Sequence, residues 1–128
     1  MGQQYLIDSN VVIDYLSGNM SAKGMNFMNR IVNDTPKMSV ITKIEVLGYQ
    51  TTQEANYLLS SFINDLIVIS LQEEIVDHTI EIRKKHKIKT PDAIIAATAR
   101  VGEFTLVSRN EKDFKNIPHL MCLNPHSL

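Results

Sequence analysis

The chain alternates between short, mostly apolar runs and longer segments in which apolar residues recur at helical spacing. Buried strands are typical of such short runs, which here cover residues 5–7, 38–41, 66–69, 104–107 and 119–123. The segments between them carry amphipathic stripes, such as Leu58, Leu59, Phe62 and Ile63. Strands that alternate with helices indicate a parallel sheet with helices on both faces. We therefore expect one α/β domain over residues 1–128, with a central parallel sheet of four or five strands.

Two helical segments differ from the others. Residues 91–100 are small or apolar almost all the way round, which predicts a helix that is buried on most sides. The stripe of Met25, Phe27 and Met28 is apolar enough to be either core or a partner surface, and core is the default for such a stripe. Right-handed crossovers would bring the carboxyl ends of all the strands to one edge of the sheet, where ligands of open α/β folds bind.

Four acidic residues occupy the same kind of position along the chain. Asp8, Glu45, Asp92 and Asp113 each follow a strand-like run and lie near the start of a helical pattern. We expect all four at one edge of the sheet, where they would repel one another unless a cation lay between them. Mg²⁺ and Mn²⁺ prefer such oxygen ligands and keep open coordination positions. An ion held there could activate water and neutralise phosphate charge.

Helix capping is an alternative explanation for three of these acids. Thr42 and Glu45 match a capping box, with Thr42 as the N-cap. Asp92 and Asp113 fall in the first turns of predicted helices, where the helix dipole favours acids. Asp8 is different because it ends a buried strand, and the two residues after it are better placed to cap. A buried carboxylate is costly unless it is paired or metal-bound.

Composition narrows the class of protein. The chain has 128 residues, of which 44% are hydrophobic and 21% charged, with a formal net charge of −1. No apolar run approaches the roughly 20 residues of a membrane helix, and the first residues show no signal-peptide pattern. The single cysteine, Cys122, cannot form an internal disulfide, so we expect a reducing cytoplasm and no membrane partner. Motifs for zinc binding, nucleotide phosphates and a serine nucleophile are absent.

Basic residues gather on one short segment. They are Arg83, Lys84, Lys85, Lys87 and Lys89. Such a cluster is typical of a solvated helix end, where cations favour the dipole. It would also suit contacts to RNA phosphates beside an acidic site. The two roles are compatible.

Four motifs in order resemble the PIN-domain family, and within it the VapC-type toxins of toxin–antitoxin pairs. They are LIDSNVVI at 6–13, ITKIEVLGY at 41–49, PDAIIAATA at 91–99 and LVSRNEKDF at 106–114. The resemblance spans nearly the whole chain. It implies a PIN-like fold and a Mg²⁺- or Mn²⁺-dependent endoribonuclease that hydrolyses phosphodiester bonds in RNA. It also implies a homodimer and a small antitoxin that neutralises the toxin.

The same resemblance implies roles for single residues. Asp8 and Asp92 would be the principal metal ligands, Glu45 would complete the coordination or hold a water, and Asp113 would be an outer or second-metal ligand. Residues that would orient these carboxylates are Ser9, Asn10, Ser108 and Asn110. Ser108 stands where the family often has threonine, which keeps the hydroxyl.

Three other functions stay open as hypotheses. A PIN-type nuclease could process RNA without a toxin role. A phosphotransferase of the haloacid-dehalogenase kind wants Asp-x-Asp after its first strand, but the run Asp8-Ser9-Asn10 lacks the second carboxylate. In a non-catalytic α/β interaction domain, the acids would only cap helices.

Overall fold

A five-stranded parallel sheet forms the centre of the molecule. The computed structural model describes residues 3–128. The strands are β1 (Tyr5–Ile7), β2 (Lys37–Ser39), β3 (Ile67–Ile69), β4 (Thr105–Val107) and β5 (Met121–Leu123). They lie in the order β3-β2-β1-β4-β5, and every neighbouring pair is parallel. The predicted α/β architecture is therefore confirmed, with β1, the first strand of the chain, in the middle.

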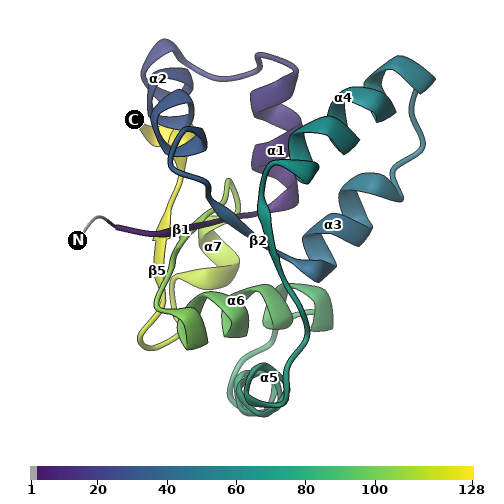
Figure 1. Cartoon of the computed structure of the whole chain (residues 1–128). Coiled ribbons are helices and arrows are strands. Elements are labelled where there is room, and N and C mark those ends of the chain that lie inside the picture. The colour runs from purple at the N-terminus through teal and green to yellow at the C-terminus, as the bar shows by residue number, and fades with distance from the viewer. Residues whose placement is uncertain (1–2) are drawn as a thin grey trace.

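Helices cover both faces of the sheet (Figure 1). They are α1 (Ser9–Leu16), α2 (Ala22–Val32), α3 (Val40–Leu47), α4 (Gln53–Asn64), α5 (Glu73–Lys85), α6 (Thr90–Gly102) and α7 (Glu111–Phe114), with a 3-10 turn, η1 (Pro125–Ser127). In Figure 1, α5 and α6 lie below the strands and α1 and α2 above them. None of the helices within residues 3–128 is both long and apolar enough to cross a membrane.

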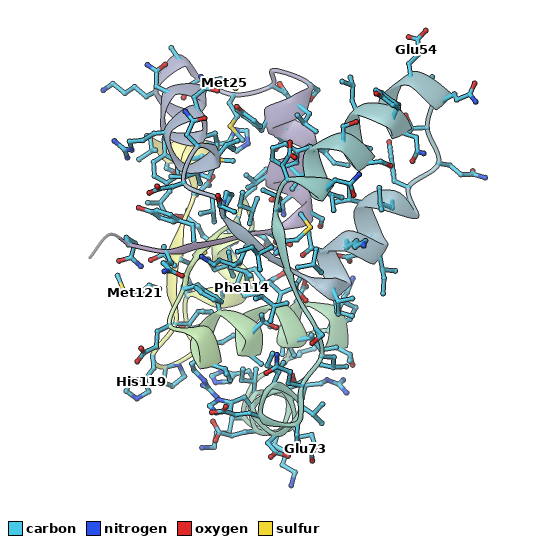
Figure 2. The ribbon with its side chains drawn as sticks, viewed as in Figure 1. Met25, Glu54, Glu73, Phe114, His119 and Met121 are labelled. Atoms are coloured by element: carbon cyan, nitrogen blue, oxygen red, sulfur yellow. The ribbon has the colours of Figure 1, made fainter. Side chains whose placement is uncertain are left out.

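The core has two halves because successive strand side chains point to opposite faces. Leu6 and Leu106 face one half, while Ile7 and Val107 face the other, and all four are fully buried. Figure 2 shows Phe114 inside the fold, and it is fully buried in the first half. The pairing Leu6–Leu106 and Ile7–Val107 in the β1–β4 register keeps both halves continuous across the sheet.

The helix predicted to be buried on most sides is α6. Ala93, Ala96, Ala97 and Ala99 are fully buried, and α6 lies between the strands and α5 (Figure 1). Small side chains allow this helix to pack on two sides at once. On the opposite face, the stripe of α2 also belongs to the core, because Phe27 is only 7% exposed and its neighbour Met28 is fully buried.

The start of α3 differs from the prediction. Strand β2 ends at Ser39, two residues earlier than expected, and the Ser39 hydroxyl caps α3 by accepting from the Ile41 amide at 3.1 Å. Thr42 is instead buried within the first turn, and its hydroxyl has no hydrogen-bond partner among the described residues. The capping-box interpretation of Thr42 and Glu45 is therefore wrong. Glu45 lies well inside the helix and does not cap it.

Candidate active site

The site lies where the strand order changes direction. The chain leaves β1 toward β2 on one side, while β4 lies on the other side. Ligands of open α/β sheets bind in the crevice beyond the carboxyl ends of the strands at such a point. Asp8 directly follows β1, and Ser108 directly follows β4. The Asp8 amide donates to the Val107 carbonyl at 2.9 Å, so the two strand ends are held together.

Asp8 is a buried carboxylate, only 3% exposed. Its Oδ2 accepts from the Ser108 hydroxyl at 2.8 Å and from Asn10 Nδ2 at 3.3 Å. Its Oδ1 accepts from the Ser9 amide at 2.8 Å, which makes Asp8 itself the N-cap of α1. The expectation that the next two residues cap this helix is therefore wrong. These donors compensate the burial of the carboxylate.

Glu45 reaches the site from α3. Its Oε1 accepts from the Ser9 hydroxyl at 3.3 Å, so Ser9 contacts both Glu45 and Asp8. Partial burial raises the pKa of Glu45, and the negative charges of Asp8 and Asp92 raise this pKa further, against the opposing effect of the Ser9 hydrogen bond. The three carboxylates are therefore close enough to disfavour one another's ionisation.

Asp92 lies in the first turn of α6, as the sequence predicts. Partial burial raises the pKa of Asp92, and the charges of Asp8 and Asp113 raise it further, while Lys89 acts in the opposite direction. The helix begins with Lys89 as its N-cap residue and makes no side-chain capping hydrogen bond. Asp92 thus lies near two other acids, and the positive charge of Lys89 offsets their effect on its pKa only in part.

The segment after β4 carries the remaining contacts to the acids. The Asn110 amide donates to the Ser108 hydroxyl at 3.0 Å, and Asn110 Nδ2 donates to Asp113 Oδ2 at 2.6 Å. Together with the bonds that Ser9 and Asn10 make, each of the four residues proposed to orient a carboxylate is hydrogen-bonded to one. The structure thus places the four acids and these four residues around one edge of the sheet.

The donor set has the chemistry of a divalent-cation site. It offers carboxylate oxygens at a crevice, with excess negative charge that a cation would relieve. Within residues 3–128, no three His, Cys, Asp or Glu side chains are already arranged so that they could hold a metal ion. The residues present nevertheless fit Mg²⁺ or Mn²⁺ in the type of oxygen donor that they offer.

A groove of about 500 Å³ lies directly beside the acids. It is lined by Arg83, Lys87, Ile88, Lys89, Asp92, Asn110 and Asp113. Three members of the predicted basic cluster thus share a groove with two of the acids. Lys85 lines a different groove, with His78, His86 and His119, and Lys84 is exposed on the same turn of α5. The basic cluster therefore does not line a single groove.

Asp14 is a buried charged residue that the sequence did not single out. Asp14 in α1 is 6% exposed and contacts both Arg109 and His126. The signal available in the sequence was its position three residues after Val11, on the buried face of the helix. Its partners lie 95 and 112 residues away in the chain, so no local pattern pointed to them.

Taken together, the parallel sheet, its central first strand and the carboxylates at its carboxyl edge define an α/β domain with an acidic site at the switch point. The PIN domain family matches residues 5–120. The chain belongs to the PIN domain family. No curated protein matches it.

Solved structures extend the likeness over almost the whole chain. A chain of a toxin–antitoxin complex from Klebsiella pneumoniae is 27% identical, with a TM-score of 0.75 over 95% of this chain and 98% of that one. A chain of DNA-bound VapBC from Salmonella typhimurium is 20% identical, with a TM-score of 0.81 and 97% and 99% covered. A chain of FitAcB from Neisseria gonorrhoeae is 19% identical, with a TM-score of 0.80 and 98% and 100% covered. The last two establish likeness of fold alone.

Proposed function

We propose that this protein is a Mg²⁺- or Mn²⁺-dependent endoribonuclease and the toxin of a toxin–antitoxin pair. The observation that carries the proposal is the group of carboxylates at the switch point, in which Asp8 and Asp92 raise the pKa of Glu45 after the effect of burial. Such a concentration of like charge is unfavourable unless it serves to bind a cation. PIN-family membership and the Klebsiella pneumoniae toxin–antitoxin complex support the nuclease and toxin assignments respectively.

Asp8 and Asp92 are the proposed principal ligands, with Glu45 and Asp113 at the periphery. When bound, the ion would activate a water molecule and offset the negative charge that develops on the phosphate. Ser108 and Asn10 hold Oδ2 of Asp8 from two directions, which fixes the plane of that carboxylate. Restraint of this kind is what metal ligands generally need from neighbouring side chains.

RNA is the proposed substrate because a cationic groove adjoins the acids. Arg83, Lys87 and Lys89 line this groove on the side of the α5–α6 turn. The Arg83 Nε donates to the Ile88 carbonyl at 3.5 Å, which helps to shape the turn. These side chains would neutralise phosphates of an RNA strand that runs past Asp92. Lys84 and Lys85 would add to the local positive potential without lining the same groove.

The remaining parts of the proposal concern partners. A small antitoxin would neutralise the enzyme, and the enzyme would be a homodimer in the cytoplasm. Exposed apolar residues on α3, α4 and the loop between them offer surface for a protein partner, and they are Ile44, Tyr49, Tyr57 and Leu58. Two of them, Tyr49 and Leu58, also line a groove of about 260 Å³.

Cleavage of RNA by purified variants tests the proposal. We expect wild-type protein with Mn²⁺ to cleave cellular RNA, and we expect a chelator or Asp8→Asn to abolish cleavage and the growth inhibition caused by expression. Asp92→Asn should have the same effect, and Asp113→Asn a smaller one. Asp77→Asn is the matched control, because Asp77 is an exposed acid of α5. Undiminished RNA cleavage by the Asp92→Asn protein in the presence of chelator would contradict the proposal.

A further inference from the structure

An ion pair between a buried carboxylate and a half-exposed arginine involves the segment that contacts the acids. The side chain of Asp14 is 8% exposed, and its Oδ2 accepts from Arg109 Nη1 at 3.0 Å. The same oxygen lies 2.8 Å from His126 Nε2. A buried carboxylate is unfavourable unless it is paired and hydrogen-bonded. Asp14 thus joins three segments that are distant in the sequence, namely α1, the segment after β4 and the C-terminal turn η1.

Arg109 stands between two residues that contact the acids. Ser108 before it donates to Asp8, and Asn110 after it donates to Asp113. A rotation or shift of the backbone at Arg109 would therefore move both hydrogen-bond donors together.

Two further contacts hold the main chain of Arg109. Its amide donates to Asn10 Oδ1 at 3.0 Å, and its carbonyl accepts from Asn124 Nδ2 at 3.5 Å. Asn124 also caps η1 by accepting from the His126 amide at 2.9 Å. The anchors on Arg109 therefore come from α1 and from the C-terminal turn, and both of these elements meet at the Asp14 carboxylate.

The C-terminal turn η1 packs closely against α2. A Cβ atom at Gly24 would lie 2.6 Å from the Pro125 carbonyl oxygen, so glycine is needed for this close approach. Buried Pro125 and the contact between His126 and Asp14 keep the turn against the body of the domain. The C-terminal turn, which carries His126, is therefore packed against both α2 and α1.

We propose that Asp14 is a positioning residue for the reaction at the acidic site, and that it acts through Arg109. This proposal rests on the proposed nuclease function. Asp14 holds the Arg109 side chain against α1, and the segment 108–110 then presents Ser108 to Asp8 and Asn110 to Asp113. Loss of the Asp14 charge releases Arg109, loosens this segment and weakens the restraint on both acids.

Arg109 could instead act on the substrate, because its side chain is 55% exposed. A half-exposed guanidinium near the site could contact an RNA phosphate directly. Its Nη1 is, however, directed to Asp14, which favours an internal role. The two roles differ in kinetics: a phosphate contact acts mainly on KM, whereas a displaced metal ligand acts on metal affinity and kcat.

A double-mutant cycle tests the proposal. Asp14→Asn, Arg109→Ala and the double variant are compared with wild type for kcat, KM on an RNA oligonucleotide, Mn²⁺ affinity by calorimetry and Tm. We expect each single variant to lose roughly tenfold or more in kcat and Mn²⁺ affinity, with KM changed by less than about twofold. The double variant should lose no more than either single variant. Arg109→Lys should recover part of the loss, and Asp77→Asn should lose nothing.

Several results would overturn the proposal. Losses that add in the double variant would separate Asp14 from Arg109. A raised KM with unchanged Mn²⁺ affinity would assign Arg109 to the substrate. A lower Tm with wild-type kcat below that Tm would make Asp14 merely structural. If Asp14→Asn does not fold, Arg109→Ala and Arg109→Lys still decide between these roles, since the Arg109 side chain is half exposed.

The outcome for wild type keeps the two proposals apart. Wild-type protein that neither binds Mn²⁺ nor cleaves RNA overturns the proposed function, and the positioning role with it. Wild-type cleavage combined with unaltered kinetics and Mn²⁺ affinity in Asp14→Asn overturns the positioning role alone.

Discussion

The hydroxyl of Ser108 donates a hydrogen bond to Oδ2 of Asp8 at 2.8 Å, and both groups are buried. The two residues end adjacent parallel strands, and they are 100 residues apart in the chain. Their contact therefore connects the start of the domain to its last quarter at the point where the acids gather.

Removing the Ser108 hydroxyl should weaken metal binding at the proposed site without unfolding the protein. Ser108→Ala deletes one donor to Asp8 and leaves the strand pairing in place. A residue that orients a metal ligand typically contributes roughly 10–100-fold to metal affinity or activity, and we expect a loss of Mn²⁺ affinity in that range by calorimetry. Ser108→Thr keeps the hydroxyl and is the matched control. Equal affinity in wild type and Ser108→Ala would mean that this bond does not restrain a ligand.

Divalent ions should stabilise the wild-type protein. An ion that binds only the folded state adds about 2.7 kcal/mol at 100 times its Kd, which corresponds to a rise in Tm of roughly 10 °C for a domain of this size. Asp8→Asn and Asp92→Asn should lose this response, and Asp113→Asn should keep part of it. Thermal melts with Mn²⁺ and with chelator measure the effect. If the acids only cap helices, Mn²⁺ will leave every melt unchanged.

Without metal, Asp92→Asn should be more stable than wild type at neutral pH. The pKa of Asp92 is raised in the folded state by burial and by neighbouring acids. The folded state therefore binds this proton more tightly than the unfolded chain, and it loses stability as the pH rises through the folded pKa. Below the ordinary value of 3.8 both states are protonated, so the difference between variant and wild type should vanish. Denaturant melts in chelator across this pH range measure it.

A less stable Asp92→Asn protein at pH 7 would contradict that expectation. It would indicate that the favourable interaction of Asp92 with the α6 dipole outweighs repulsion from the other acids. Asp77→Asn serves again as the control for removing a surface carboxylate of a helix.

The salt dependence of RNA affinity should test whether the groove lined by Lys87 binds RNA as proposed. If Lys87 contacts a phosphate, Lys87→Gln should reduce the slope of log affinity against log salt by about 0.7 for single-stranded RNA. Lys23→Gln on α2 is the control, because Lys23 lines a groove that contains none of the four acids. Fluorescence anisotropy with Asp8→Asn protein, which should bind without cleaving, measures both. Equal slopes in the two variants would exclude Lys87 as a phosphate contact.

The lone thiol should be poorly reactive. Burial raises the pKa of Cys122 to about 11, and the charges of Glu111 and Asp8 contribute in the same direction. Only the thiolate reacts with alkylating agents, and at pH 8 about one thiol in a thousand would be ionised. Iodoacetamide should therefore modify native protein far more slowly than protein in denaturant. Equal rates by mass spectrometry would mean that the thiol is open to solvent.

The sequence was informative wherever a local pattern had a single structural meaning. Short apolar runs separated by amphipathic segments predict a parallel sheet, and the alanines of α6 predict burial. Asp8 could be placed at the end of its strand because the run before it has no polar residue from Tyr5 to Ile7 apart from the tyrosine hydroxyl.

Patterns with two meanings led to errors. Thr42 and Glu45 have the spacing of a capping box, but an earlier serine, Ser39, caps the helix because the strand ends sooner than its apolar run. Asp8 was set aside as a cap although it both caps α1 and belongs to the acidic site. The first error came from where a strand ends and the second from where a helix begins, and apolar content determines neither position.

Contacts that depend on tertiary structure could not be predicted at all. Asp14, Arg109 and His126 meet only because β4 lies beside β1 and the C-terminal turn folds back to α1. Nothing in the local sequence of any one of them indicates the other two.

The separation of Asp8 and Ser108 along the chain also determines when the site can form during synthesis. A ribosome makes the first acid of the site almost at once, but the strand that brings its partner comes only near the end of translation. Every nascent chain that has not reached β4 therefore lacks the assembled site. On the proposed function, nuclease activity would require a nearly complete chain, and products that end before β4 should not cleave RNA.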